Sequence, residues 1–304
     1  MRTPRSLLFA AFIVVGCRFS CLDTRGQTTD QKLPTNTKAR TIVDLSPEEL
    51  RRLYRPELGR VVFDEKQEEL HVLLNKTGDN VEAFFRNMPN TASREQIVSQ
   101  RLKPGGEVDA SVSSSYNYLL LVRPDIVGVR FVEDRTDSKN RPSDLRRLSE
   151  YLVTSGFAGH CIILHPSHQY GSRFRYLGRQ PAEPRARLIA FAQKPEVGDF
   201  VTSISGMEVT PVLLQGLVWI DQDSYQILRM RTDLLEPDYH NGVTSQTTEV
   251  WLSEVHFDGI QQVFWLPREV RVTCEYWHKI FRNLHTYSDY KLFTVASYDK
   301  IVKP

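Results

Sequence analysis

The chain has 304 residues, with 39 Lys and Arg against 37 Asp and Glu, a formal charge of +2. Such a balance supplies no basic face, so a nucleic-acid partner is not expected. The length is sufficient for one large β-domain with its own core.

Residues 1–26 predict an export signal. Arg2 and Arg5 precede an apolar run over residues 7–15, which suits a signal peptide and is shorter than the roughly 20 residues of a membrane-spanning helix. A buried N-terminal helix is the alternative interpretation. We therefore expect an exported bacterial protein, located in the periplasm or at the periplasmic face of the outer membrane.

Two cleavage sites fit this signal. Residues 14–17 read Val-Val-Gly-Cys and resemble a bacterial lipobox, which would make Cys17 the lipidated first residue and tether the protein to a membrane. A cut near Gly26 would release a soluble protein instead. Cleavage before Cys17 brings the formal charge from +2 to zero, because it removes two arginines and no acid.

The segments after the signal divide into a linker and one domain. Residues 27–40 are polar, without a hydrophobic period, and predict a disordered linker. Residues 41–304 are expected to form a single domain. Ser46 and Pro47 followed by two acids are typical of a helix start. Apolar residues at three- and four-residue steps predict an amphipathic helix over residues 64–88, with Gly78 as a potential interruption.

Strand patterns then dominate the chain. Residues 96–102, 116–122, 127–131, 157–164, 174–177 and 187–193 predict strands, with a charged loop over residues 134–144 and a short helix over residues 144–154. From residue 211 to 295 the sequence predicts an antiparallel meander with strands over residues 212–220, 225–231, 247–257, 263–266, 269–277, 279–287 and 291–295. In the strand over 279–287, His285 and Tyr287 share one face with Phe281 and Asn283.

Cys161 and Cys274 lie in apolar, strand-like stretches. Free cysteine is commonly buried, so two core cysteines are the favoured interpretation. A disulfide between them is the alternative, because spacing in the sequence does not establish the Cα distance that a bridge requires.

One group of residues suggests a metal site: His160, His165 and His168. Histidines are common metal ligands, but on a strand His160 and His165 would point to opposite faces. Loop and strand-end histidines are therefore favoured over a site. The sequence has no glycine-rich phosphate loop and no G-x-S-x-G turn, so we expect neither an enzyme nor a cofactor.

Large aromatic residues recur along the C-terminal strands. Trp219, Trp251, Trp265 and Phe281 are the predicted walls of an apolar cavity on one curved sheet. Most single aromatic residues belong to a core. A cavity is predicted because so many of them lie on one sheet.

Residues 216–221 (Gly-Leu-Val-Trp-Ile-Asp) and 225–229 resemble a hairpin of the LolA-type carriers that sort outer-membrane lipoproteins. Residues 265–267 (Trp-Leu-Pro) and 287–293 resemble later strands of the same group, and residues 83–102 and 155–180 resemble a family of uncharacterised exported bacterial proteins. The carrier resemblance implies a mainly β, α+β fold: a half-open antiparallel β-barrel of roughly 10–11 strands, capped by helices around a cavity for acyl chains.

Three functions follow as hypotheses. The first is a non-enzymatic cell-envelope protein that binds an apolar ligand, a lipid or the acyl chain of a lipoprotein. The second is a secreted interaction or scaffold domain whose core is filled. The third is a metal-assisted hydrolase that uses His160, His165 and His168.

Overall fold

The computed structural model of the chain describes residues 11–13, 40–125, 128–139, 141, 156–181, 185–197, 201–205, 208–239 and 241–293. Apart from residues 11–13 and Arg40, the predicted export signal, Cys17 and the predicted linker lie outside these ranges. The helix predicted over residues 144–154 also lies outside them.

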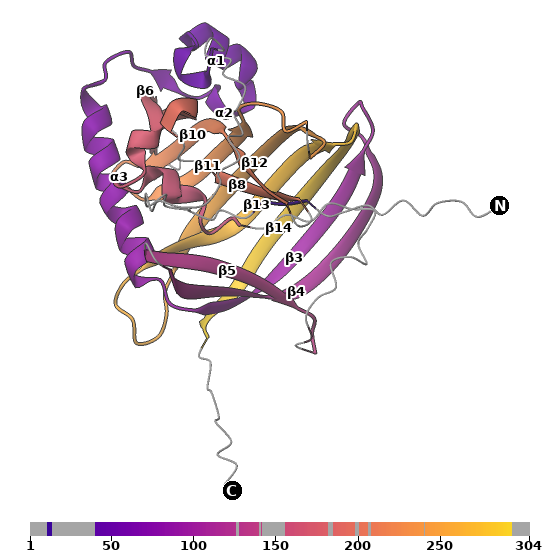
Figure 1. The fold of residues 1–304 in the computed structure, drawn as a ribbon. Coiled ribbons are helices and arrows are strands. Elements are labelled where there is room, and N and C mark those ends of the chain that lie inside the picture. The colour runs from indigo at the N-terminus through magenta and orange to yellow at the C-terminus, as the bar shows by residue number, and fades with distance from the viewer. Residues whose placement is uncertain are drawn as a thin grey trace, which may run out of the picture.

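The fold is dominated by one open antiparallel sheet of 11 strands (Figure 1). The order across the sheet is β2-β6-β7-β10-β11-β12-β13-β14-β3-β4-β5, and the two edge strands do not pair with each other. This confirms the predicted half-open antiparallel barrel. The strands are β2 (Val62–Phe63), β3 (Thr91–Leu102), β4 (Val108–Asp125), β5 (Gly128–Thr136), β6 (Ser172–Gln180), β7 (Ala186–Gln193), β10 (Leu214–Asp221), β11 (Ile227–Leu234), β12 (Val243–Val255), β13 (Phe264–Tyr276) and β14 (Lys279–Leu292).

A smaller sheet and a few helices complete the fold. The small sheet has the order β1-β8-β9. None of the helices that the structure describes has the length and apolarity needed to cross a membrane. The remaining elements are β1 (Ala11–Ile13), β8 (Val201–Ser205), β9 (Glu208–Val212), α1 (Pro47–Leu53), α2 (Arg55–Leu58), α3 (Glu68–Asn87) and the 3-10 turns η1 (Ile42–Asp44), η3 (His160–Leu164), η4 (Gln169–Gly171) and η5 (Pro195–Val197).

The large sheet is strongly curved, and α3 lies on its concave face. Leu73 of α3 packs with Tyr176 of β6, whereas Phe85 of α3 stacks on Phe131 of β5, with 4.9 Å between ring centroids. β6 and β5 are nine strand positions apart, about 43 Å on a flat sheet. Leu73 and Phe85 are 12 positions apart in α3, which is only about 18 Å along the helix. One short stretch of α3 reaches both ends, so the sheet must curl around it.

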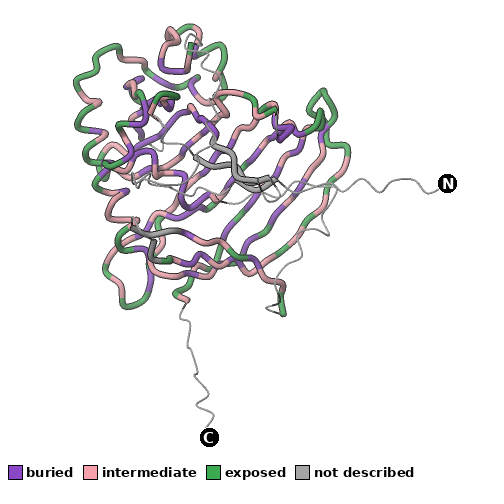
Figure 2. Tube along the Cα trace, in the orientation of Figure 1, coloured by how far each residue is buried: buried purple, intermediate pink, exposed green. Residues whose placement is uncertain are grey.

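Burial separates the two ends of the sheet. In β7 nearly every residue is buried, because Ile189 and Phe191 pack toward α3 while Leu188 and Ala190 pack against the segment that carries α1 and α2. In β3 buried positions alternate with less buried ones, as expected of a strand covered on one face. Figure 2 shows the same contrast, with buried positions along the strands and exposed ones on the turns and the outer side of α3.

The helix signals read from the sequence are confirmed. The hydroxyl of Ser46 accepts a hydrogen bond from the backbone of Glu49, which bonds back to Ser46, and Pro47 is the first helical residue. The predicted interruption of α3 at Gly78 is wrong, since the helix continues through it. A Cβ at Gly78 would lie 2.8 Å from Nε2 of Gln169, so this glycine allows α3 to approach the η3–η4 segment closely.

Other expectations need correction. The strand predicted over residues 157–164 is wrong, because residues 160–164 form the 3-10 turn η3. The strands predicted over 263–266 and 269–277 are one strand, β13, in which a bulge follows Pro267. Cys161 and Cys274 are both free, which confirms the core-cysteine interpretation.

Candidate functional site

A cavity of about 220 Å³ lies between α3 and the concave face. Val81, Ala83 and Phe84 of α3 form one wall, and Leu252 and Phe264 of the sheet lie opposite them. Val81 and Phe264 are almost completely buried, so these walls are largely shielded from water. The full set of lining residues is Asn80, Val81, Ala83, Phe84, Ala158, Cys161, Gln226, Ile227, Leu252, Gln262, Val263, Phe264 and Trp265.

Two amide side chains fasten α3 across this cavity. Asn80 donates a hydrogen bond of 2.9 Å to the backbone carbonyl of Ser224, in the turn between β10 and β11. Asn87, two helical turns further on, donates to Oε1 of Gln262 at 2.8 Å. Both bonds are exposed, so each contributes only about 1 kcal/mol. The polar contacts of the helix at the cavity are therefore weak, and the apolar packing of Val81 and Phe85 adds to them.

Cys161 supplies a thiol to the cavity wall. Burial raises the pKa of this thiol to about 12. Since the thiolate is the reactive form, Cys161 is protonated and a poor nucleophile at neutral pH. It serves as an apolar lining group.

Part of the remaining concave face is filled by the segment over residues 156–164. Phe157 packs edge-to-face on His285, with 4.9 Å between ring centroids, while Ile163 and Leu164 join Leu73 of α3 in the core. This segment therefore occupies part of the half-barrel. Among the described residues, an unfilled space remains between α3 and the strands β11–β13.

Beyond Phe157 the concave face carries a buried charge cluster centred on Glu95 of β3. Arg135 of β5 donates two hydrogen bonds to the two carboxylate oxygens, one of them 2.8 Å long. Nδ1 of His285 and the hydroxyl of Tyr287, both on β14, lie 2.9 and 2.8 Å from Oε1. The side chains of Glu95 and His285 are fully buried. We call Glu95, Arg135, His285 and Tyr287 the Glu95 cluster.

The cluster keeps Glu95 ionised despite its burial. Burial alone would raise the pKa of Glu95, but the charge and hydrogen bonds of Arg135, with the bond from His285, lower it to about 2. Burial lowers the pKa of His285, and Glu95 opposes this shift. An ionised carboxylate can only accept, so Nδ1 of His285 must carry the proton that it shares with Glu95.

Glu95 is heavily hydrogen-bonded. It receives four hydrogen bonds from three side chains, three of them at Oε1 and one at Oε2. With its pKa lowered to about 2, such a carboxylate is a weak proton acceptor at neutral pH. The arrangement fits a brace that ties β3, β5 and β14 together better than it fits an acid–base pair.

A second, partly buried carboxylate lies beside this cluster. Glu133 accepts a 2.7 Å hydrogen bond from the backbone of Gly156. Burial raises the pKa of Glu133, with Arg135 opposing the shift. Glu133 thus joins the 156–164 segment to β5.

The four predicted wall residues divide between the two faces. Trp219 and Trp251 lie on the convex face, because both pair across the sheet with Arg229, whose guanidinium stacks on both rings at 4.3 and 4.9 Å. Trp219 is buried there beside the segment that carries α1 and α2. Trp265 lines the cavity. Phe281 shares the concave face with His285 and is buried in the core group of Val243, Cys274 and Tyr276.

The histidines of the predicted metal group are not arranged as ligands. His160 is buried, with Nδ1 3.0 Å from the carbonyl of Gly156, and His165 bonds to Ser167. The ring centroids of His165 and His168 are 5.8 Å apart. In the described parts of the chain no three His, Cys, Asp or Glu side chains could hold a metal ion together.

The Glu95 cluster was not predicted from the sequence, although half of its signal is visible there. His285 and Tyr287 fall on the same predicted strand face. Glu95 occupies an inward position of β3, between Ser93 and Ile97, and a charged residue at such a position requires a buried partner. The partner could not be identified, because Arg135 lies in a stretch predicted as a charged loop.

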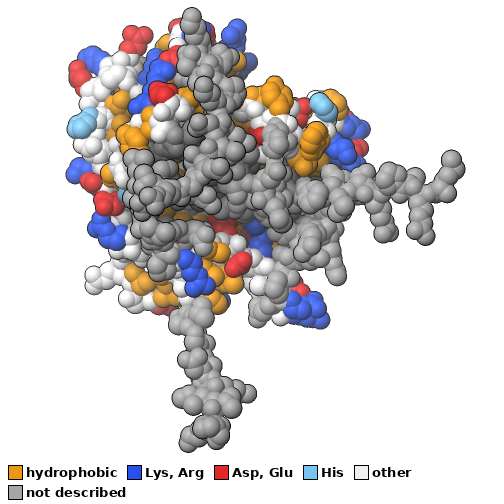
Figure 3. All heavy atoms as spheres, viewed as in Figure 1, with side chains coloured by type: hydrophobic (Ala, Val, Ile, Leu, Met, Phe, Trp, Pro, Cys, Tyr) orange, Lys and Arg blue, Asp and Glu red, His pale blue; other side chains and the backbone are white. Residues whose placement is uncertain are grey.

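Charge on the outer surface is mixed. On the face that Figure 3 shows, acidic and basic side chains alternate around the rim, with hydrophobic side chains between them. This view contains no continuous block of one sign, in keeping with the near-neutral formal charge.

No protein-family model and no curated protein matches the chain. Among solved structures, the chain is similar to a domain from Vibrio parahaemolyticus provisionally named an outer membrane lipoprotein-sorting protein domain. The TM-score is 0.38 and the identity 9%, over 74% of this chain and 93% of that one. A DUF1329 family protein from Desulfovibrio piger is similar with TM-score 0.36 and 12% identity, over 75% of this chain and 94% of that one. Likeness at this level carries no argument about fold, ligand or activity.

Proposed function

We propose that the chain is an exported, non-enzymatic cell-envelope protein that binds an apolar ligand, a lipid or the acyl chain of a lipoprotein. Its place would be the periplasm or the periplasmic face of the outer membrane, with Cys17 as a lipid tether if the lipobox is used. The observation that carries the proposal is the cavity between α3 and the concave face.

The size of the cavity sets what it can hold. Its volume of about 220 Å³ equals that of roughly seven liquid water molecules and falls below the roughly 300–1,000 Å³ of pockets for drug-sized ligands. A short, thin segment fits, and each CH₂ that leaves water contributes about 0.8 kcal/mol. The site therefore suits one acyl chain entering end first, with Trp265 as part of the wall.

A longer chain would require α3 to move away from the sheet. Such a movement breaks the side-chain hydrogen bonds that Asn80 and Asn87 donate beside the cavity. The movement would also separate Val81 and Phe85 from their apolar partners. Nearer the N-terminus of the helix, Leu73 is anchored in the core. We therefore expect the C-terminal half of α3 to act as the lid, while its N-terminal half stays docked.

A second candidate function is an interaction domain with a filled core. The observation in its favour is the 156–164 segment, since Phe157 and Ile163 occupy concave space that a large ligand would need. The two candidates differ in whether the remaining cavity admits a ligand, which a binding experiment decides.

The first test is to purify the exported protein gently and compare its native and denatured masses. A lipid that co-purifies and is lost on denaturation would support the carrier, and a covalent diacylglycerol on Cys17 would show only the tether. The purified protein is then titrated with dansylundecanoic acid, and energy transfer from tryptophan to dansyl is measured. We expect saturable binding, with transfer reduced in Trp265→Phe.

The matched variants place a phenylalanine on two faces of α3. Ala83→Phe fills the cavity and is expected to weaken binding at least tenfold. Val72→Phe puts the same side chain on the same helix at a position that is 48% exposed, and should leave binding unchanged. Equal binding by both variants, or a lipid-free protein that ignores the probe, would favour the filled-core domain.

A further inference from the structure

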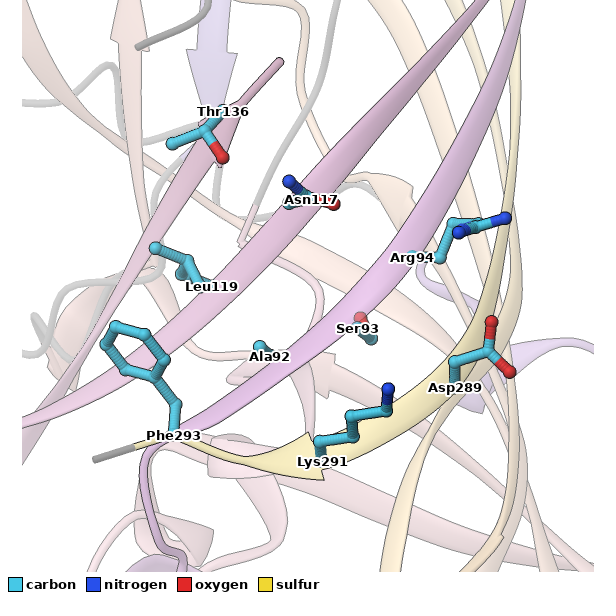
Figure 4. Close-up of a pocket in the computed structure, with 9 residues that line it drawn as sticks. All are labelled: Ala92, Ser93, Arg94, Asn117, Leu119, Thr136, Asp289, Lys291 and Phe293. Atoms are coloured by element: carbon cyan, nitrogen blue, oxygen red, sulfur yellow. The ribbon is translucent and has the colours of Figure 1, made fainter. Parts of the chain in front are cut away.

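A second depression, of about 500 Å³, lies on the strands β3, β4 and β14 (Figure 4). Arg94 of β3 and Lys291 and Asp289 of β14 line it together with Asn117, Leu119 and Phe293. Buried positions of β3 alternate through Thr91, Ser93 and Glu95 on the concave face. Arg94 therefore points to the convex face, and the depression is independent of the proposed ligand cavity.

The sheet register arranges these side chains in two rows. In the first row Arg94 pairs with Ser288 on one side and Asn117 on the other, and Asn117 pairs with Thr136. In the second row Ala92 pairs with Lys291 and with Leu119. One row is therefore polar and the other is mainly apolar, and Phe293 lies beside the second row (Figure 4).

Arg94 and Lys291 are placed to share one anion. They are diagonal neighbours across β3 and β14, so their Cα atoms are about 7–8 Å apart, and both side chains are long enough to meet above the sheet. Neither has a hydrogen-bond or ion-pair partner among the described residues. Two unpaired cations this close repel each other, and an oxyanion between them would relieve that repulsion.

Asp289 places one negative charge beside the two cations. The register shifts between Ser288 and Lys291, and Asp289, in this bulge, has a positive φ of 56°. Along β14, Asp289 lies between Ser288, which is opposite Arg94, and Lys291, which is opposite Ala92. A simple anion would be repelled by this carboxylate, whereas a ligand with an ammonium group next to its anion would not.

The geometry points to a binding site for a phosphoethanolamine head group. Arg94 and Lys291 bind the phosphate through charge-assisted hydrogen bonds, Asp289 binds the ammonium, and Leu119 and Phe293 contact the first apolar atoms beyond the phosphate. The chemistry is shared by a soluble phosphoethanolamine compound and by the head group of a membrane lipid.

The test is calorimetric titration of the purified full chain, at fixed ionic strength, with O-phosphoethanolamine, phosphocholine and inorganic phosphate. We expect O-phosphoethanolamine to bind most tightly, because its small ammonium can donate hydrogen bonds to Asp289 and that of phosphocholine cannot. R94Q and K291Q should each weaken it about tenfold, and D289N should remove the preference over inorganic phosphate. K279Q, which neutralises an exposed lysine at the other end of β14, is the matched control.

Phosphate binding that equals or exceeds O-phosphoethanolamine binding would overturn the assignment, and so would affinities that the three variants leave unchanged. If the assignment holds, sedimentation with phosphatidylethanolamine vesicles distinguishes the sources, since only a lipid head group carries the protein down with the membrane. Cavity variants such as Ala83→Phe should not change these titrations, so failure of this site and failure of the carrier proposal are separate results.

Discussion

The two halves of the concave face are chemically opposite. Under α3, the strands β11–β13 present apolar side chains around an unfilled cavity. Under the 156–164 segment, β14, β3 and β5 present the Glu95 cluster, in which a carboxylate receives four hydrogen bonds. One half retains space and few directional contacts, and the other has many directional contacts.

This difference indicates that the two halves have different roles. An apolar wall can part from its neighbour and close on a ligand, because the hydrophobic effect has no preferred direction. A buried ion pair tolerates little displacement, because each partner left alone carries a large desolvation penalty. We therefore expect ligand binding to follow the α3 half and stability to follow the Glu95 half.

The largest expected effect comes from removing the carboxylate of the cluster. Glu95→Ala removes the carboxylate that forms the buried ion pair with Arg135, and loss of one partner of a buried pair costs about 3–5 kcal/mol. Urea unfolding monitored by tryptophan fluorescence measures the change. Binding of the dansyl probe by the folded variant should remain as in the parent.

The control removes a carboxylate from an exposed ion pair. Glu107 lies 3.8 Å from Lys103 and both are largely exposed, so Glu107→Gln should change the free energy of unfolding by less than about 1 kcal/mol. If Glu95→Ala costs no more than this control, the cluster is not the brace that we describe.

The pH dependence of stability is the next largest effect. The pKa of Glu95 is about 2 in the folded protein and 4.5 in its ordinary state. A lowered folded-state pKa gives stabilisation that is complete above the unfolded pKa and is lost as the pH falls toward the folded pKa. The difference of roughly 2.5 pKa units corresponds to about 3 kcal/mol.

Glu95→Gln isolates this contribution, since every other carboxylate titrates in both proteins. We expect the stability advantage of the parent over the variant to shrink by about 3 kcal/mol between pH 5 and pH 2. Unfolding curves at several pH values measure the difference. Curves for the two proteins that run parallel through this window would mean that Glu95 is not held at a low pKa.

The architecture was predictable because hydrophobic periodicity and the residues that start helices and turns are read from short stretches of sequence. The alternation over residues 279–287 placed His285 and Tyr287 on one face of β14, and the Ser46–Pro47 start of α1 was also correct. Curvature and register are not local. Whether Trp219 faces the concave or convex side depends on which elements cover β10, so the sequence could not distinguish it from Trp265.

The 156–164 segment shows a second limit of local patterns. Its apolar run Cys161–Ile162–Ile163–Leu164 has the composition of a strand, yet it forms η3. Leu164 and Ile163 find their partners on α3, not on a neighbouring strand. Tertiary packing therefore overrides β-propensity here, and with it the face argument that was applied to His160 and His165.

A smaller effect is expected when the cavity is enlarged. Leu252→Ala removes a partly buried lining side chain and should cost about 2 kcal/mol of stability, while longer acyl probes bind more tightly. Leu217→Ala, in the core of the convex side, should cost at least as much and leave probe affinity unchanged. Titration with dansyl fatty acids of increasing length separates the two, and identical length preferences would place the ligand elsewhere.

The smallest effects concern the attachments of α3. Asn80→Ala and Asn87→Ala each remove one exposed hydrogen bond, worth about 1 kcal/mol or less. If the C-terminal half of α3 is the lid, these variants should speed both hydrogen exchange in residues 80–87 and release of the probe. Asn75→Ala, whose bond to His71 stays within the helix, should do neither. Equal acceleration by all three would show that α3 loosens as a whole, because a lid must open about one end while the other stays packed in the core.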